Sequence, residues 1–169
     1  IVTGAVVRLT GSGLGCPTWP QCVEGSYTPT ARQEEVFHKY IEFGNRLLTF
    51  VLVLIAIAVL VAMFINVRSR RRAGIAQRPA IIVLSVIPFV GTAAQAVLGG
   101  VTVLTGLHPL IVSAHFLLSM VLVTAAVALV ARSGDLGDQP VIRLAPTPVR
   151  LLTWLMVSVA ALVVVLGVI

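Results

Sequence analysis

The feature that most constrains this chain is a series of apolar blocks, each long enough to cross a membrane. Residues 47–65, 80–104 and 110–131 form three of them, and a fourth starts near residue 149 and is still apolar at residue 169. A hydrocarbon core of about 30 Å is crossed by about 20 helical residues. Because barrel strands need only about half that length, we expect an all-α membrane protein built as a transmembrane helix bundle.

The composition agrees with a membrane protein and excludes several soluble classes. Hydrophobic residues make up 58% of the chain, charged residues only 11%, and the mean hydropathy is +1.05. Soluble domains carry about 25% charged residues. A disordered chain and a disulfide-rich miniprotein are excluded by the apolar blocks. The net charge of +6 lies in short loops between them, so we expect the lipid bilayer as a partner and no nucleic acid.

The distribution of arginines predicts how the chain is oriented. Segment 66–79 contains five of them, at positions 68, 70, 71, 72 and 78. Cytoplasmic loops of membrane proteins carry an excess of Lys and Arg, so we expect this segment in the cytoplasm. The connection 132–148, with Arg132 and Arg143, lies two spans later and is expected on the same side. Segment 8–40 then faces the outside.

Two further features predict how the chain is divided. Residues 1–7 form an apolar stub that does not begin with Met, so we expect the end of a helix and interpret the chain as a fragment. The stretch 133–148 is rich in Gly, Pro and Asp and is typical of a linker. We expect a first four-helix unit over residues 1–132, with its outer loop at about 8–40, then this cytoplasmic linker and the start of a second unit at 149–169.

Two cysteines lie in the outer segment, where the environment is oxidising. Cys16 and Cys22 bound the sequence Cys-Pro-Thr-Trp-Pro-Gln-Cys. A disulfide between them would close a small loop and contribute about 2 kcal/mol on the chain-entropy model. A redox-active pair that exchanges thiols is the alternative. The preceding glycines, Gly11, Gly13 and Gly15, are expected to permit tight turns.

A polar stripe opens the next helix, which we expect to start near Glu34. Spacings of four and three residues place His38, Glu42 and Asn45 on one helical face, because seven residues complete nearly two turns. Glu42 lies about one turn above the apolar run, where a carboxylate is costly and indicates a function. The alternative is a capping or snorkelling acid that pairs with Arg46 four residues later.

Polar residues are few in the two following spans. Gln95 lies among alanines and glycines that permit close helix packing, and we interpret it as an interhelical hydrogen-bond partner or, alternatively, as a ligand contact. His115 lies inside an apolar helix as either a hydrogen-bonded core residue or a ligand of haem iron. His108 precedes Pro109 and is expected to start that helix. Together with the preceding polar stripe, the histidines suggest a shared pocket for a planar cofactor.

Five short motifs follow one another along nearly the whole chain and together resemble the haem A synthase family. They are Gly-Ser-Gly-x-Gly-Cys at 11–16, Trp-Pro-x-Cys at 19–22, Ile-Glu-aromatic-small-x-Arg at 41–46, Gln-Ala-x-Leu-Gly at 95–99 and Ala-His-Phe at 114–116. The resemblance implies a membrane enzyme of cytochrome oxidase assembly, in a bacterial plasma membrane, with eight helices in two pseudo-symmetric four-helix halves. This chain is similar to the end of helix 1, helices 2–4 and the start of helix 5.

The resemblance also implies a reaction and its participants. Members oxidise the methyl group of haem O to a formyl group by successive hydroxylations, with haem b as prosthetic group in the second half. The resemblance implies that Glu42 is the essential glutamate, that His115 is a haem ligand, and that Cys16 and Cys22 are the outer cysteine pair. Haem O synthase is the expected supplier of the substrate, and a homo-oligomer is left open.

One position departs from the family pattern, in which a histidine follows the glutamate by three residues. Asn45 stands there, followed by Arg46. Because an amide is a poor iron ligand, either His38 replaces it or the iron is five-coordinate. We expect His115 to be a ligand of the haem iron, with His38 as a further candidate ligand. The wider set expected to contact haem consists of His115, His38, Asn45, Arg46, Gln95 and His108.

Two other classes of function are open as alternatives. One is a non-catalytic membrane subunit that uses His115 to hold haem during assembly, and the other is half of a small transporter. Transporters contain helices interrupted by Gly and Pro. Apart from Pro88, such interruptions are not evident in the spans, which disfavours the transporter.

Overall fold

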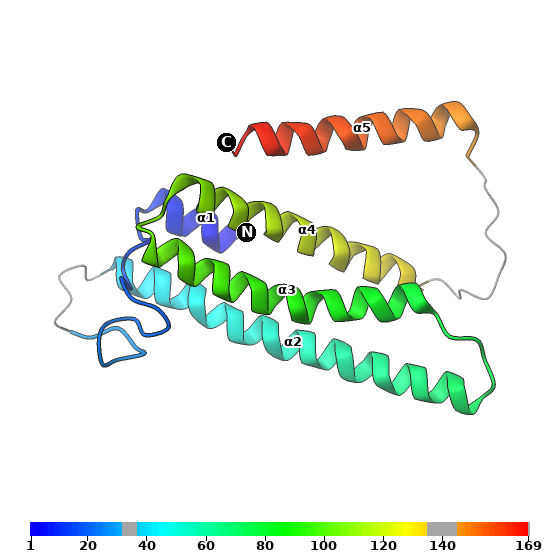
Figure 1. The fold of residues 1–169 in the computed structure, drawn as a ribbon, viewed down its shortest axis with the longest axis horizontal. Helices are drawn as coiled ribbons and strands as arrows, with labels where there is room; N and C mark the ends of the chain where they lie inside the picture. Colours follow the sequence, from blue (N-terminus) through cyan, green and yellow to red (C-terminus); the bar gives the residue numbers. More distant parts are fainter. Residues whose placement is uncertain (32–36, 135–144, 169) are drawn as a thin grey trace.

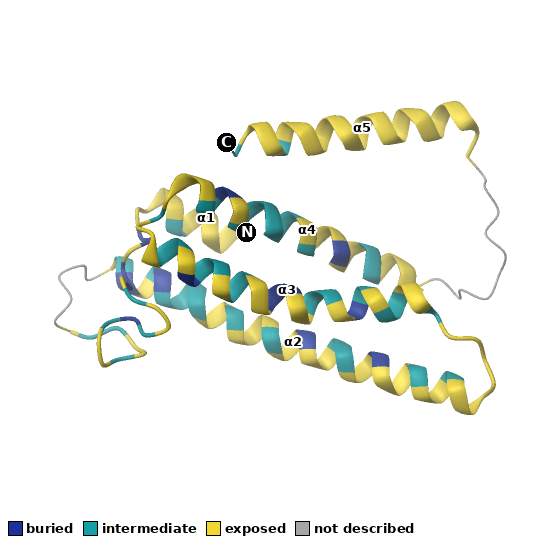
Figure 2. Cartoon of the chain, viewed as in Figure 1, coloured by how far each residue is buried: buried dark blue, intermediate teal, exposed yellow. Residues whose placement is uncertain are grey.

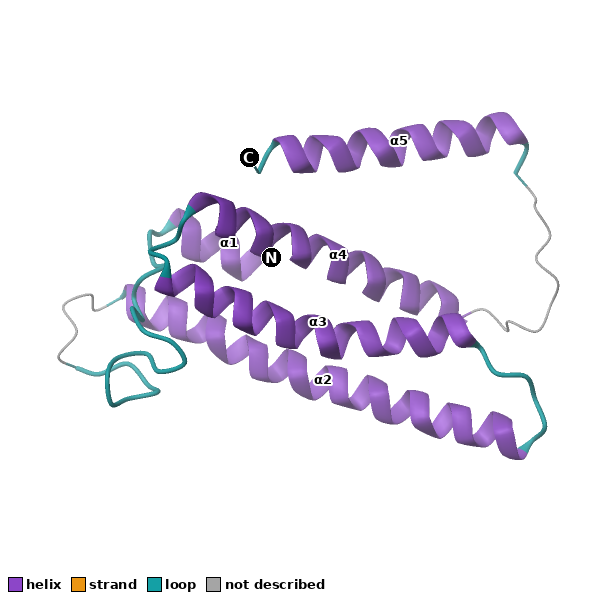
Figure 3. Ribbon diagram, viewed as in Figure 1, coloured by secondary structure: helices purple, strands orange, loops and turns teal. Residues whose placement is uncertain are grey.

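Helices and the loops that join them make up the residues that the computed structural model describes, which are 1–31, 37–134 and 145–168 (Figure 1; Figure 3). The helices are α1 (Val2–Leu9), α2 (His38–Arg72), α3 (Pro79–Leu104), α4 (Pro109–Gly134) and α5 (Thr147–Leu166). Four of them, α2 to α5, are long and apolar enough to cross a membrane. Outside the helices, the described residues contain an isolated β-bridge between Val23 and Ser26 and no strand. The predicted all-α membrane fold is confirmed.

The helix bounds differ from the expected spans mainly at the end of α2. The apolar run ends at residue 65, yet α2 continues to Arg72, so the connection to α3 is residues 73–78 rather than 66–79. Arginines occupy the last turn of α2, where cations interact favourably with the negative end of the helix dipole. The helix therefore extends through a segment that polarity alone assigned to a loop.

Some of the sequence predictions fall on residues that the structure does not describe. The expected start of α2 near Glu34 lies in segment 32–36, and Arg143 of the expected linker lies in segment 135–144. The stub at 1–7 is helical as expected, and α1 ends at Leu9.

Helices α2, α3 and α4 pack side by side, and α1 packs against α2 (Figure 1). Gly91 of α3 faces Leu122 of α4 so closely that a methyl group on the glycine would overlap the leucine side chain. Such close approach at small residues is how membrane helices associate. Exposed residues run along all the helices (Figure 2). Many of them carry large apolar side chains, as a lipid-facing surface requires.

Helix α5 runs apart from the other helices for most of its length (Figure 1). None of its described residues is buried. Beyond its end, the carbonyl of Val168 accepts a hydrogen bond of 2.6 Å from Oγ of Ser113 in α4.

The packed helices have two chemically different ends. At one, which we call the disulfide end, the C-terminus of α1 meets the start of α2 and the turn from α3 to α4. Leu107 in that turn has a φ of 63°, and its side chain packs on Gly13. At the other, the arginine end, Nη2 of Arg78 donates a hydrogen bond of 2.6 Å to the carbonyl of Arg132 in the last turn of α4.

Candidate functional site

The disulfide loop, residues 16–22, lies at the disulfide end. A disulfide joins Cys16 and Cys22, and both cysteines are fully buried. The predicted disulfide is therefore confirmed. Gly15 precedes it, and a Cβ built there would lie 2.6 Å from the backbone oxygen of His38. Gly11 has a φ of 66° and makes the expected turn, whereas Gly15 is required because two backbones meet.

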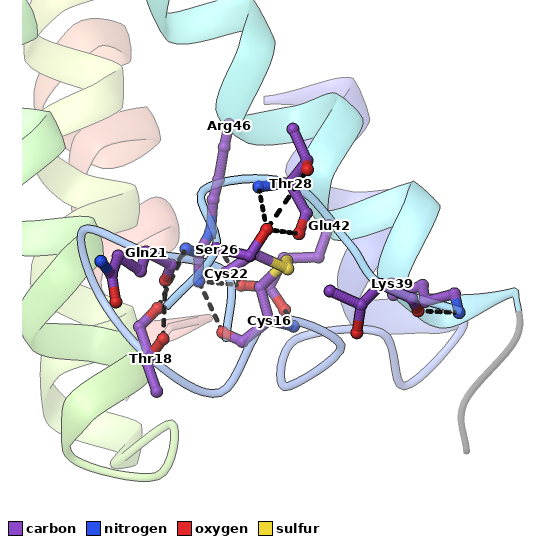
Figure 4. Close-up of a disulfide and its surroundings, with 10 residues drawn as sticks. Cys16, Thr18, Gln21, Cys22, Ser26, Thr28, Lys39, Glu42 and Arg46 are labelled. Atoms are coloured by element: carbon purple, nitrogen blue, oxygen red, sulfur yellow. Dashed lines mark hydrogen bonds and ion pairs between the residues drawn. A yellow bond between two sulfur atoms is a disulfide. The ribbon is translucent and has the colours of Figure 1, made fainter. Parts of the chain in front are cut away.

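Glu42 attaches the disulfide loop to α2 (Figure 4). The residue is 4% exposed, and its Oε2 accepts a hydrogen bond of 2.7 Å from the backbone N–H of Cys16. Its Oε1 accepts hydrogen bonds from Nε and Nη2 of Arg46, at 3.1 and 2.6 Å. The pairing with Arg46 that the sequence left as an alternative is present. These partners offset the cost of removing a carboxylate from water.

Arg46 binds three backbone carbonyls of the disulfide loop. Its Nη2 donates to the carbonyl of Cys16 at 2.6 Å, and its Nη1 donates to the carbonyls of Thr18 and Gln21 at 3.0 and 3.1 Å. A guanidinium group presents five N–H donors in a rigid plane, whereas an ammonium group is a compact charge on a flexible stem. The shape of the loop therefore depends on an arginine at this position.

The other two residues of the polar stripe bind α1 and the segment that follows it. Nδ1 of His38 lies 2.8 Å from Oγ of Ser12, and Oδ1 of Asn45 accepts a hydrogen bond of 2.8 Å from Oγ1 of Thr3. The stripe thus uses its polar groups to hold residues 3–16 against α2. None of these hydrogen bonds reaches His115.

Gln95 and His115 meet between α3 and α4. Nε2 of Gln95 donates to the carbonyl of His115 at 3.0 Å and to Oγ of Ser119 at 2.7 Å. Ser119 in turn donates to the carbonyl of His115 at 3.0 Å. This arrangement is the interhelical hydrogen bond that the sequence indicated for Gln95.

Two buried polar atoms remain beside this hydrogen-bond group. Among the described residues, Nδ1 of His115 and Oε1 of Gln95 are buried and have no hydrogen-bond partner. The imidazole packs on Gly99, where a built Cβ would lie 3.4 Å from Cε1 of His115. Buried polar atoms without partners are rare in proteins and call for an explanation. A ligand that binds His115 is one such explanation.

His108 stands apart from both groups. The residue is exposed, and its backbone carbonyl accepts hydrogen bonds from the N–H groups of Ile111 and Val112 at the start of α4. This is the helix-start role expected from the sequence. In the part of the chain that the structure covers, no three His, Cys, Asp or Glu side chains cluster as a metal site would require.

Two residues of the site were not assigned from the sequence. Trp19 of the disulfide loop packs on Gly100 of α3, where a built Cβ would lie 2.5 Å from Cδ2 of the indole. Ser119 completes the group formed by Gln95 and His115. In the sequence, Trp19 could have been found from the Trp-Pro-x-Cys motif. Ser119 could have been found because it lies one helical turn after His115.

Known proteins resemble this chain over most of its length. One heme A synthase, from Geobacillus thermodenitrificans, is 33% identical over 116 residues, which are 68% of this chain and 32% of that protein. Another, from Geobacillus kaustophilus (strain HTA426), is 34% identical over the same shares. A third, from Lysinibacillus sphaericus (strain C3-41), is 34% identical over 130 residues, or 76% of this chain and 38% of that protein.

The chain spans about a third of the length of these relatives. No solved structure matches it. The family model of the COX15-CtaA cytochrome oxidase assembly proteins matches residues 1–169. With its spanning helices and its bacterial relatives, the chain is a multi-pass protein of a bacterial plasma membrane and belongs to the COX15-CtaA family of cytochrome oxidase assembly proteins.

Proposed function

We propose that this chain acts as part of a haem A synthase, an oxidoreductase that converts the methyl group of haem O to a formyl group by successive hydroxylations. The family match and the relatives named heme A synthase support the proposal. The observation that carries it is the imidazole of His115, which lies next to α3 with a buried nitrogen that no described residue binds.

His115 fits haem iron best among the residues expected to contact haem. Imidazole is a common axial ligand of iron, and the partner-free nitrogen marks this ring as available. Asn45 accepts a hydrogen bond from Thr3, and an amide oxygen is a poor ligand. His38 is bound to Ser12 through Nδ1, so only its Nε2 could bind iron. We therefore propose that His115 holds haem O and that Asn45 is not an iron ligand.

We further propose that Glu42 exchanges a proton during the oxidation. A buried acid at the edge of the membrane suits general acid–base chemistry. Both of its oxygens accept hydrogen bonds, from Cys16 and Arg46. Protonation would remove the negative charge that Arg46 and the Cys16 N–H bind, and would weaken both interactions, so that loop movement and proton exchange would be linked.

Haem b is proposed as the prosthetic group, bound by the part of the relatives that lies beyond the matched residues. When bound, it supplies the redox chemistry of the oxidation. Haem O synthase is proposed as the supplier of the substrate, and a homo-oligomer is compatible with this scheme. The arginine end is proposed to face the cytoplasm, with the disulfide end in the oxidising compartment outside.

Substitutions in the full-length protein test the proposal. His115→Ala should lose binding of haem O, followed by the Soret band in a titration. Glu42→Gln should bind haem O and stop its conversion, followed by chromatography of extracted haems. Asn45→Ala is the matched control on the same helix face and should leave the spectrum nearly unchanged. Normal conversion by Glu42→Gln would reduce Glu42 to an anchor of the disulfide loop.

The same measurements separate the alternative functions. A haem band without conversion in the unaltered protein would favour a non-catalytic haem-binding subunit, and the absence of any haem band would favour a transporter. Helix α3 runs through Pro88 without a break. Each of the described spans, α2 to α5, is a single continuous helix, whereas transporters use interrupted helices at their binding sites.

A further inference from the structure

Trp19 and His115 pack on adjacent glycines of α3. A Cβ built on Gly100 would lie 2.5 Å from Cδ2 and 2.7 Å from Cε2 of Trp19. A Cβ built on Gly99 would lie 3.4 Å from Cε1 of His115. Adjacent residues point about 100° apart around a helix. The indole and the imidazole therefore press on one short stretch of α3 backbone from two directions, with no side chain of either glycine between.

The position of Trp19 is set from α2. The ring belongs to the disulfide loop, whose carbonyls at Cys16, Thr18 and Gln21 are bound by Arg46. Cys16 also donates its N–H to Glu42. The disulfide loop is thus held on α2 by hydrogen bonds that do not involve α3. Trp19 belongs to this loop, so its contact with Gly100 fixes the position of α3 relative to α2.

The position of His115 is set from α3. Gln95 lies one helical turn before Gly99 and donates to the carbonyl of His115 and to Ser119. The hydrogen bonds hold the backbone of α4 close to α3, and Gly99 supplies the surface on which the imidazole lies. The orientation of the imidazole consequently depends on where the α3 backbone lies at Gly99 and Gly100.

We propose that Trp19 is a positioning residue for His115, acting through the backbone of α3 at Gly99 and Gly100. The indole prevents the end of α3 from moving away from α4, and so keeps the imidazole packed and shielded. Trp19 is 40% exposed, and the buried part of its indole is the Cδ2–Cε2 edge that packs on Gly100. Loss of this contact removes the group that holds the α3 backbone in place at Gly100. Any effect of Trp19 on the binding of haem O rests on the proposed function. The packing of Trp19 and His115 on adjacent glycines of α3 does not.

The test measures the reactivity of each histidine in the full-length, haem-free protein. Diethyl pyrocarbonate modifies accessible neutral imidazoles, and mass spectrometry gives the rate at each site. Trp19→Ala should raise the rate at His115 by about threefold or more, because local opening exposes the ring. Trp19→Phe should restore much of the protection. Should Trp19→Ala not fold, Trp19→Leu and Trp19→Phe give the same graded comparison.

Matched controls come from the chain itself. Trp154 in α5 is 66% exposed, and Trp154→Ala should leave the rate at His115 unchanged. Gly100→Ala should displace the indole and raise the rate at His115 as Trp19→Ala does. In the Trp19→Ala background it should raise that rate little further, because the new methyl group has space there. Gly44→Ala, at a glycine with nothing within 4 Å of a built Cβ, should have no effect.

Two outcomes would overturn the proposal. One is an unchanged rate at His115 in Trp19→Ala. The other is an equal rise at His38, His108 and His115, which would show general loosening rather than positioning. A selective rise at His115 together with normal haem O binding by His115→Ala would support the role of Trp19 and contradict the proposed role of His115 in haem binding.

Discussion

Glu42 and Arg46 lie one turn apart on α2, with Oε1 of the glutamate 2.6 Å from Nη2 of the arginine. The pair also binds both polar groups of the Cys16 backbone, since Glu42 accepts its N–H and Arg46 donates to its carbonyl. The side chains are 6% and 20% exposed. One ion pair thus fixes where the disulfide loop lies against α2.

Arg46→Ala should strongly destabilise the disulfide end. The substitution leaves the Glu42 carboxylate buried without its cation, and breaking a buried ion pair costs about 3–5 kcal/mol. Arg46→Lys should recover only part of this loss, because an ammonium group cannot bind three carbonyls in one plane. Unfolding in detergent titrations measures the change. Arg68→Ala, at an exposed position of the same helix, is the control, and equal stability of the two alanine variants would contradict the prediction.

Gly15→Ala should destabilise the protein because its methyl group meets backbone atoms. A Cβ at this position would lie 2.6 Å from the carbonyl carbon and oxygen of His38 and 2.7 Å from Cα of Lys39. Overpacking of this kind costs about 1–3 kcal/mol. Gly44→Ala, inside α2 with open space around it, should instead gain up to about 1 kcal/mol from helix propensity. Thermal unfolding distinguishes the two, and similar shifts would argue against the close contact.

Gln95 and Ser119 should show a coupling free energy in a double-mutant cycle. Their hydrogen bond of 2.7 Å joins α3 to α4, and such bonds in membrane proteins contribute about 0.6 kcal/mol on average, up to about 1.7. Gln95→Ala, Ser119→Ala and the double variant are compared by unfolding. Thr124, whose hydroxyl binds the carbonyl of Met120 in its own helix, replaces Ser119 in the control cycle and should give no coupling. Purely additive effects of Gln95 and Ser119 would show that the bond contributes nothing.

The arginine end should be cytoplasmic. Ser69 is exposed in the last turns of α2, and Thr105 is exposed beyond α3 at the disulfide end. In intact cells, a membrane-impermeant maleimide should label Thr105→Cys and leave Ser69→Cys unlabelled until the membrane is opened. The reverse pattern would place the disulfide in the reducing compartment and overturn the orientation.

The sequence by itself determined the helices and the local pairs. A backbone in hydrocarbon must satisfy its hydrogen bonds internally, so the apolar blocks could form only helices, and they did so between residues 79 and 104 and between residues 109 and 134. Helical periodicity placed Glu42 beside Arg46. The six-residue separation of Cys16 and Cys22 made a small disulfide loop feasible. Each of these results depends on residues close together in the chain.

Only the tertiary structure decided which partners the polar groups take. The convergence of Arg46 on carbonyls 25 to 30 residues earlier, and the packing of Trp19 on Gly100, depend on how the loop folds back over the helices. The hydrogen bonds of His38 with Ser12 and of Asn45 with Thr3 depend on where α1 packs. Helical periodicity predicts which side chains lie on the same face of a helix. It does not predict which neighbouring helix or loop they contact, because the packing of segments distant in sequence sets those contacts.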